Sequence, residues 1–222
     1  NYVSFNNELW RIIGVFKDID DGTGKTETRL KIARSESIGN YAWDSNGLNE
    51  WPTATSNTYL NETYLNSLTS ESKTMIANVL WNLGGWDTAQ MYANQFYEYE
   101  RGTNVYSGHS TEWIGKIALM YPSDYMYAGD LSKCSEVGSD WDADVNNCRN
   151  KSWLRNTSYI QWALSPNSFG LSYTFGVNNS GYISNDNGGV RSYNAVRPVL
   201  FLNSTVQITG GDGTQNNPFT LE

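Results

Sequence analysis

Two glutamates two residues apart, Glu98 and Glu100, are the first candidates for acid–base chemistry in this chain. Two carboxylates about 5 to 9 Å apart can flank a glycosidic bond and hydrolyse it. Residues two apart on a strand share a face, so the pair has access to this geometry. The alternative is an ion pair between a glutamate and the adjacent Arg101, anchoring a loop. We expect the ion pair.

His109 is the only histidine, which excludes sites built from several imidazoles. It leaves one imidazole for proton transfer, and no Gly-x-Ser-x-Gly nucleophile elbow accompanies it. Its neighbours are Ser107, Gly108 and Ser110, so we expect a residue of a turn. Taken with the glutamates, this predicts that the protein is not an enzyme.

An acidic loop offers a metal-binding pattern, because Asp140, Asp142 and Asp144 alternate along it. An EF-hand needs Gly at its sixth position and Glu at its twelfth, whereas Val145 and Lys151 stand there. An irregular calcium site of the kind lectins use stays open. We expect a solvated acidic loop and no cofactor.

The same loop carries both cysteines, Cys134 and Cys148. An exposed pair in an exported protein is expected to form a disulfide, which would stabilise by roughly 3 kcal/mol in the chain-entropy model. The alternative is two free thiols in a cytosolic protein.

Residues 165–195 have the composition of a binding surface. Apolar segments bracket this window, which is rich in Asn, Ser, Gly and Tyr and almost uncharged. Recognition loops converge on these residues, because Tyr gives rigid contact area and Asn, Ser and Gly give adaptable hydrogen bonds. Trp86, in polar company, could stack on a sugar or cover a loop. The predicted contact residues are Tyr173, Phe175, Asn178, Asn179, Tyr182, Asn185, Asn187, Tyr193 and Trp86.

Composition limits the class of ligand and the compartment. The net charge is −8 and the pI about 4.7, and no Lys/Arg cluster provides a basic footprint, so nucleic acid is excluded as a partner. No run of eighteen apolar residues is present, so any membrane anchor or export signal is expected outside this sequence. We expect an extracellular or cell-surface domain.

The elements needed to position these residues follow from periodicity. Residues 2–16 alternate around Asn6-Asn7 and predict a hairpin, and residues 29–33 predict a further strand. Helices are expected over 56–68, with Leu60, Tyr64 and Leu68 on one face, and over 70–83. Further strands are expected over 113–121, 173–177, 182–184, 195–202 and 218–221. This pattern predicts one α+β domain, residues 1–222, whose N- and C-terminal antiparallel β ribbons bracket two helices and long irregular loops.

Several large or charged residues are expected in the interior. Arg197 lies in an otherwise apolar strand, so we expect its guanidinium to be buried and hydrogen-bonded to backbone carbonyls or an acid. Most tryptophans with apolar neighbours are expected to support the core. They are Trp10, Trp43, Trp81, Trp113 and Trp153.

The order of these segments resembles a domain-of-unknown-function family found on surface and pilin-like proteins of Gram-positive gut bacteria. The resemblance covers nearly the whole chain. It is carried by Phe5-Asn-Asn-Glu-Leu-Trp10-Arg-Ile-Ile-Gly-Val-Phe16, Ser37-Ile-Gly39, Trp43-Asp44-Ser45, Glu98-Tyr-Glu-Arg101-Gly-Thr103, Trp162-Ala-Leu-Ser-Pro166, Gly181-Tyr182, Val196-Arg-Pro-Val199 and Ile208-Thr-Gly-Gly-Asp-Gly-Thr214.

That family is similar, more distantly, to the C-type-lectin fold of formylglycine-generating enzymes and of variable proteins made by diversity-generating retroelements. The resemblance implies a C-type-lectin-like fold whose last ribbon displays variable positions, with Arg197 and Trp162 as structural residues. Formylglycine generation depends on a cysteine pair on the last strands, whereas Cys134 and Cys148 precede that region.

Three functions remain as hypotheses. The first is a recognition domain of adhesin or pilin-tip type, diversified or not, that binds a protein or glycan on another cell or surface. The second is a carbohydrate-active or formylglycine-generating-type enzyme. The third is a structural surface or pilus subunit.

Overall fold

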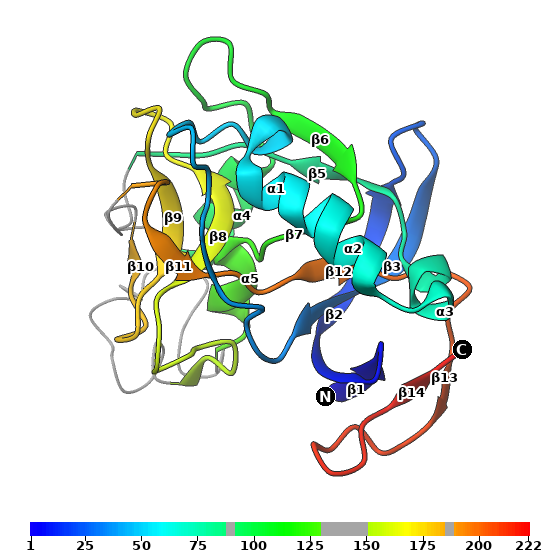
Figure 1. Cartoon of the computed structure of the whole chain (residues 1–222). Helices are drawn as coiled ribbons and strands as arrows, with labels where there is room; N and C mark the ends of the chain where they lie inside the picture. The colour runs from blue at the N-terminus through cyan, green and yellow to red at the C-terminus, as the bar shows by residue number, and fades with distance from the viewer. Residues whose placement is uncertain (88–91, 130–150, 185–188) are drawn as a thin grey trace.

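The computed structural model describes residues 1–87, 92–129, 151–184 and 189–222. These residues form a mixed α+β structure of antiparallel sheets and short helices (Figure 1), as the sequence predicts. The buried apolar side chains of the sheets and helices form one continuous core.

The first five-stranded sheet begins with the predicted N-terminal hairpin. Its strands, in spatial order, are β1 (Tyr2–Phe5), β2 (Glu8–Asp20), β3 (Thr26–Arg34), β12 (Val199–Phe201) and β7 (Ile117–Ala118). Asn6 and Asn7 connect β1 to β2 with φ of 56° and 57°. Asparagine tolerates this left-handed region, so the pair closes the two-residue turn that alternation on either side requires.

The second five-stranded sheet contains many of the described residues of the 165–195 window. Its spatial order is β10 (Ile183–Ser184), β9 (Thr174–Val177), β8 (Gln161–Pro166), β11 (Tyr193–Ala195) and β4 (Asn40–Ala42). Every residue of β8 and β9 is buried, and α5 (Pro122–Tyr127) contacts both strands.

The predicted strand over 195–202 is two strands in different sheets. The chain leaves the second sheet after Ala195 and enters the first at Val199, so Arg197-Pro198 lies at the crossing. The predicted strand over 113–121 is divided in the same way. Glu112–Gly115 is β6, paired with β5 (Val79–Asn82), and the chain then enters the first sheet as β7.

The two chain ends lie side by side, as the terminal ribbons predict. β13 (Ile208–Gly210) and β14 (Thr220–Leu221) form a two-stranded ribbon beside β1 (Figure 1). The Ser4 N–H donates to the Phe219 carbonyl at 2.8 Å, and the Phe219 N–H donates to the Tyr2 carbonyl at 2.9 Å.

The first predicted helix is confirmed as a continuous helical segment. A short 3-10 turn, η1 (Trp51–Thr53), is followed by α1 (Thr55–Thr58), the π-helical η2 (Tyr59–Tyr64) and α2 (Leu65–Ser67). Leu60, Tyr64 and Leu68 are buried, as their four-residue spacing predicts. The Asn61 amide donates to the Ile117 carbonyl at 2.8 Å and accepts from its N–H at 3.0 Å, which ties the segment to β7.

The second predicted helix is half as long as expected. α3 covers Ser70–Met75 and is capped by the Thr69 hydroxyl, which accepts from the Ser72 N–H. The expected continuation to residue 83 is wrong, because Val79–Asn82 pairs with β6 instead of extending the helix. Two helices of the described ranges were not predicted at all: α4 (Ala93–Glu100) and α5 (Pro122–Tyr127). Pro122, expected to end a strand, occupies the first turn of α5.

Most of the expected tryptophan core is confirmed. Trp10, Trp43 and Trp81 are fully buried, whereas Trp113 and Trp153 are half-buried against the core. None of the helices in the described ranges has the length and apolar character needed to cross a bilayer.

Candidate recognition surface

Three loops that flank the strands of the second sheet are joined by backbone hydrogen bonds. The Asn49 N–H donates to the Leu171 carbonyl at 2.7 Å. The Asp44 N–H donates to the Val190 carbonyl at 3.0 Å, and the Val190 N–H donates to the Ser172 carbonyl at 2.9 Å. The loops after β4, before β9 and before β11 are therefore one hydrogen-bonded unit.

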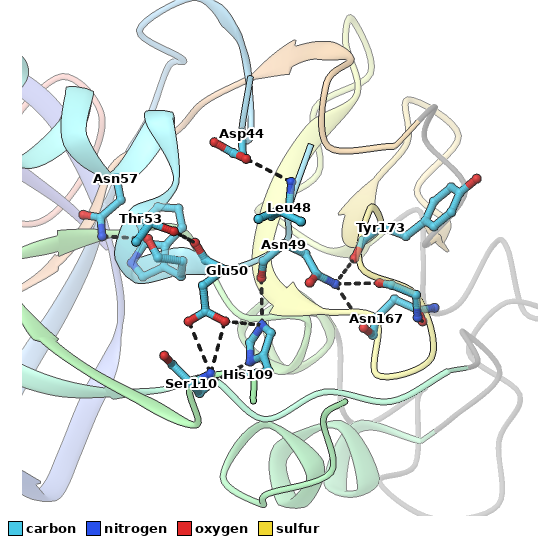
Figure 2. Close-up of polar contacts among 12 residues, drawn as sticks. Asp44, Leu48, Asn49, Glu50, Thr53, Asn57, His109, Ser110, Asn167 and Tyr173 are labelled. Atoms are coloured by element: carbon cyan, nitrogen blue, oxygen red, sulfur yellow. Dashed lines mark hydrogen bonds and ion pairs between the residues drawn. The ribbon is translucent and has the colours of Figure 1, made fainter. Parts of the chain in front are cut away.

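A single buried amide holds the loop between β8 and β9. The Asn49 Nδ2 lies 3.0 Å from the Asn167 carbonyl, 2.9 Å from that of Gly170 and 2.6 Å from that of Tyr173 (Figure 2). An amide NH₂ has only two hydrogens, so the three acceptors share them. We call this arrangement the Asn49 clamp. It fixes the 167–173 backbone at both ends and near its middle.

The clamped loop also contains its own turn. The Asn167 Oδ1 accepts from the Phe169 N–H at 2.8 Å and from the Gly170 N–H at 3.0 Å. This is the local side-chain-to-backbone bonding that makes asparagine favourable in turns. Asn167 is itself buried, so its side chain lies on the inner side of the loop.

Further polar residues position Asn49 itself. The Asp44 carboxylate accepts from the Leu48 N–H at 2.9 Å (Figure 2). It also accepts from the Thr55 N–H at 3.2 Å, which ties the loop to the start of α1. The His109 Nε2 lies 2.8 Å from the Asn49 carbonyl. Two sides of the clamp are therefore supported by residues outside the 165–195 window.

His109 is thus a buried supporting residue that follows a turn at 107–108. The Glu50 carboxylate accepts from the Ser110 N–H at 3.1 and 3.2 Å, and its Oε2 lies 3.7 Å from the His109 Nε2. Both ring nitrogens lie against carbonyl oxygens, which accept hydrogen bonds only. The ring therefore holds the 109–110 segment against the Asn49 loop, and its nitrogens are taken by backbone groups.

Apolar side chains project into solvent from this rigid unit. Five of the eleven exposed large hydrophobic residues belong to it, so exposure is concentrated here and not spread evenly over the described chain. Phe169 is the most exposed, at 88%, and Tyr193 follows at 72%. We call these residues the loop-edge surface: Leu48, Phe169, Leu171, Tyr173 and Tyr193.

The predicted contact residues divide into two groups around β9. Tyr173 precedes this strand and belongs to the loop-edge surface, as does Tyr193. Asn178 and Asn179 follow β9 in a turn whose Gly181 N–H donates to the Asn178 carbonyl, and Tyr182 comes next. These three are at least partly accessible, but they lie at the opposite end of a strand about 13 Å long. They do not share a surface with Tyr173.

Two of the predicted contact residues are wrong. Phe175 and Trp86 are buried, with rings stacked at 4.3 Å and 23° between their planes. Phe96 of α4 packs edge-on against Trp86 at 4.4 Å. The sequence did not reveal α4, so the helix that covers Trp86 was not foreseen, and this indole is not available to stack on a sugar.

Other predicted residues fall outside the described ranges. Asn185 and Asn187 of the window are among them, as are the possible calcium ligands Asp140, Asp142 and Asp144 and the expected disulfide between Cys134 and Cys148. Phe169, Leu171 and Leu48 were missed. Their signal in the sequence was the placement of single apolar residues between Asn, Ser and Gly.

Glu98 and Glu100 do not form a carboxylate pair. Both lie on α4, where residues two apart are about 200° apart around the axis. Glu98 is exposed, whereas Glu100 is fully buried. Glu100 accepts from the Ser123 N–H at 2.8 Å and pairs with Arg101 at 3.3 Å, so the expected ion pair is present, on a helix. Burial raises the pKa of Glu100 to about 7.

Arg197 is buried and bonded to carbonyl oxygens, as its apolar strand predicts. Its Nη1 donates to the Leu154 carbonyl at 2.8 Å and to the Gln161 side chain at 3.1 Å, and its Nε donates to the Arg34 carbonyl at 3.1 Å. These bonds join the two sheets where the chain crosses between them. Trp162 is also buried, and its indole N–H donates to the Tyr41 carbonyl at 2.9 Å.

Within the described ranges, no three His, Cys, Asp or Glu side chains gather in a way that could hold a metal ion. Comparison of the chain with protein-family models, with curated proteins and with solved structures found no match.

Proposed function

We propose that this chain is an extracellular or cell-surface recognition domain that binds a protein or glycan through the loop-edge surface. The observation that carries the proposal is the combination at residues 167–173 of a fixed backbone with outward apolar side chains. Phe169 is 88% exposed, yet the chain on either side of it is held by the Asn49 clamp. Burying one such side chain against a partner would contribute about 1.5–3 kcal/mol.

Rigidity strengthens this argument, because ordering a loop on binding costs free energy. A clamped loop has already met that cost on folding, so more of the contact energy appears as affinity. Tyr173 and Tyr193 add amphipathic rings of the kind enriched in recognition loops and binding hot spots. The loop-edge surface is formed by uncharged side chains, which suits a neutral protein face or a glycan.

We further propose that the fold is C-type-lectin-like and that the chain belongs to the surface- and pilin-associated family it resembles, as an adhesin or pilin-tip domain. The α+β architecture and the closely placed termini are compatible with this assignment. In this proposal, residues 165–195 are a site of diversification. Homologous genes from neighbouring strains should then differ more in codons 165–195 than elsewhere, and an even distribution of differences contradicts that part.

The binding proposal is tested with two exposed residues of the loop-edge surface and one exposed residue elsewhere. The purified domain is applied to a glycan array, to immobilised surface proteins and to host cells, as wild type, Phe169→Ser, Tyr193→Ser and Val15→Ser. Val15 is 67% exposed on β2, so it is the matched control. Loss of binding in the first two variants with retention in the third supports the proposal.

Two results would count against it. Binding that survives both loop substitutions places the ligand elsewhere on the molecule. Concentration-dependent self-association that is lost in Phe169→Ser, measured by light scattering, instead identifies the loop-edge surface as a contact between copies in a structural subunit.

A further inference from the structure

A second site lies away from the loop-edge surface, in a cavity of about 380 Å³ beside the N-terminal hairpin. Among the described residues, four arginines line it: Arg11, Arg34, Arg155 and Arg197. Two carboxylates of the described residues, Glu8 and Glu36, line it with them. In a chain of net charge −8, this local excess of positive charge is opposite to the overall balance.

Arg34 and Glu8 neutralise each other. The Arg34 Nε and Nη2 donate to the two Glu8 carboxylate oxygens at 2.9 and 3.0 Å, a fork-to-fork ion pair. This pair removes Glu8 as a counter-charge for the other arginines. The positive charge of the cavity therefore rests on the remaining guanidiniums.

Arg11 is held in place by aromatic rings. Its guanidinium carbon lies 4.5 Å from the centre of the Tyr2 ring and 4.3 Å from that of Trp153. The hydrogen bonds that it makes go to neutral oxygens at 3.3 to 3.4 Å, those of Asn1 and the Trp153 backbone. Since the rings cover its faces, its N–H groups point outward in the plane of the guanidinium. No carboxylate of the described residues lies within ion-pair distance of it.

Arg197 is buried without a carboxylate partner in the described part of the chain. Its Nε and Nη1 are used by neutral oxygens, and no described residue provides a partner for its Nη2. Removing a guanidinium from water without a paired anion is costly, even when some of its N–H groups are bonded. Neither Arg11 nor Arg197 therefore has a carboxylate partner among the described residues.

We propose that this cavity binds the carboxylate group of a small organic anion, about the size of a sugar acid, through Arg11 and Arg197. The Arg11 guanidinium can offer a planar edge to a planar carboxylate, and the Arg197 Nη2 can add a further hydrogen bond. A single negative charge fits better than a phosphate dianion, because Glu36 also lines the cavity. The volume lies at the small end of the range for small-molecule sites. This site shares no residue with the loop-edge surface, so it does not depend on the proposed recognition function.

The test uses the whole chain and sodium glucuronate, with glucose as the uncharged match and acetate as the carboxylate alone. Inorganic sulfate, at equal ionic strength, reports a non-selective anion site. Binding is followed by isothermal titration calorimetry and by the NMR signals of the arginine Nε–H groups. We expect saturable binding of glucuronate, weaker binding of acetate and none of glucose, with shifts confined to the arginines of the cavity.

Substitutions identify the residues. Arg11→Gln should lower glucuronate affinity at least tenfold, and Arg11→Lys should restore only part of it, because a lysine keeps the charge but not the fork. Lys73→Gln, which removes one charge from α3, should bind as the wild type does. The NMR titration of the wild type needs no variant, so it tests the site even if Arg11→Gln folds poorly.

Three results would overturn the proposal. Equal binding of glucose and glucuronate removes the role of the carboxylate. Stronger binding of sulfate than of glucuronate replaces the carboxylate with a general anion. No saturable response to any carboxylate, at concentrations well above a millimolar Kd, removes the site.

Discussion

The Asn49 clamp makes the sharpest prediction for the loop-edge surface, because one side chain holds three carbonyl groups. Asn49→Ala removes the donor and leaves the Asn167, Gly170 and Tyr173 carbonyls without it. Two hydrogens are lost, each contributing about 1 kcal/mol net, and carbonyls left without a donor add to the cost. We expect a loss of about 2–4 kcal/mol in the free energy of unfolding or of local loop opening.

Asn49→Asp has the same shape and a larger expected effect. Its carboxylate places acceptor atoms 2.6 to 3.0 Å from three acceptor oxygens, with no donor between them. An aspartate here is a buried, unpaired charge, so Asn49→Asp should lower the free energy of unfolding by more than Asn49→Ala does. Asn78→Ala is the matched control, because Asn78 is exposed and should change stability by less than about 0.5 kcal/mol.

Two measurements separate local from global loss. Thermal unfolding followed by circular dichroism should show a fall in Tm of about 2–4 °C per kcal/mol for a chain of this size. Hydrogen exchange of the Val190 amide, which donates to the Ser172 carbonyl, should accelerate by about tenfold per 1.4 kcal/mol of local destabilisation. Unchanged exchange in Asn49→Ala, or a milder effect of aspartate than of alanine, would refute the clamp reasoning.

Three other residues give predictions of stability. Burial raises the pKa of Glu100 from its ordinary 4.5 to about 7, so between these two pH values the folded state keeps a proton that the unfolded state releases. The free energy of unfolding should therefore fall by about 3 kcal/mol as the pH rises from 4.5 to 7. Glu100→Gln should lose most of that slope in urea titrations, and an unchanged slope would assign it to another group. In urea unfolding, Phe175→Ala should lower the free energy of unfolding by about 3–5 kcal/mol, because this ring is buried. Phe169→Ala should lower it by less than about 0.5 kcal/mol, because this ring is 88% exposed. Equal losses of stability in the two variants would contradict this placement. Asn7 has a φ of 57°, a left-handed conformation that valine adopts poorly and glycine adopts freely. In thermal melts, Asn7→Val should therefore lose about 1–2 kcal/mol of stability and Asn7→Gly almost none. Similar melting curves for the two variants would show that the turn does not require a left-handed residue at this position.

Local patterns in the sequence predict the elements whose causes are local. The Asn6-Asn7 turn and the alternation around it are sufficient for the first hairpin. The four-residue spacing of Leu60 and Tyr64 is sufficient for the first helix. In each case the residues that determine the element are close together along the chain.

Elements that depend on distant partners could not be predicted in this way. The apolar spacing of residues 76–83 fits a helix, but Trp81 pairs with Trp113, 32 residues later, and the segment becomes a strand. α4 buries Ala93, Phe96 and Glu100 and otherwise presents polar or aromatic side chains, so its amphipathic signal is weak. Its helical form depends on packing against Trp86, which the sequence does not display.

The same dependence on distant partners explains which of the predicted contact residues are exposed and which are buried. Phe169 and Phe175 lie six residues apart in similar surroundings, but one is on an outer loop and the other on the second strand of a five-stranded sheet. Asn49 is 118 to 124 residues away from the carbonyls that it holds. Arg197 was predictable, because a charge in an apolar strand requires buried partners wherever they come from.

The clamp also explains which residues of the window can change without loss of structure. Asn49 contacts the backbone carbonyls of 167, 170 and 173, and these atoms are present whatever the side chains are. Its supports, Asp44 and His109, lie outside the window. We therefore expect substitution at exposed positions such as Phe169 to leave the loop conformation intact. Asn167 differs, because its own side chain closes the turn, so we expect it to tolerate fewer substitutions than Phe169. A scaffold of this kind separates stability from specificity, which is what a binding surface with changeable contents requires.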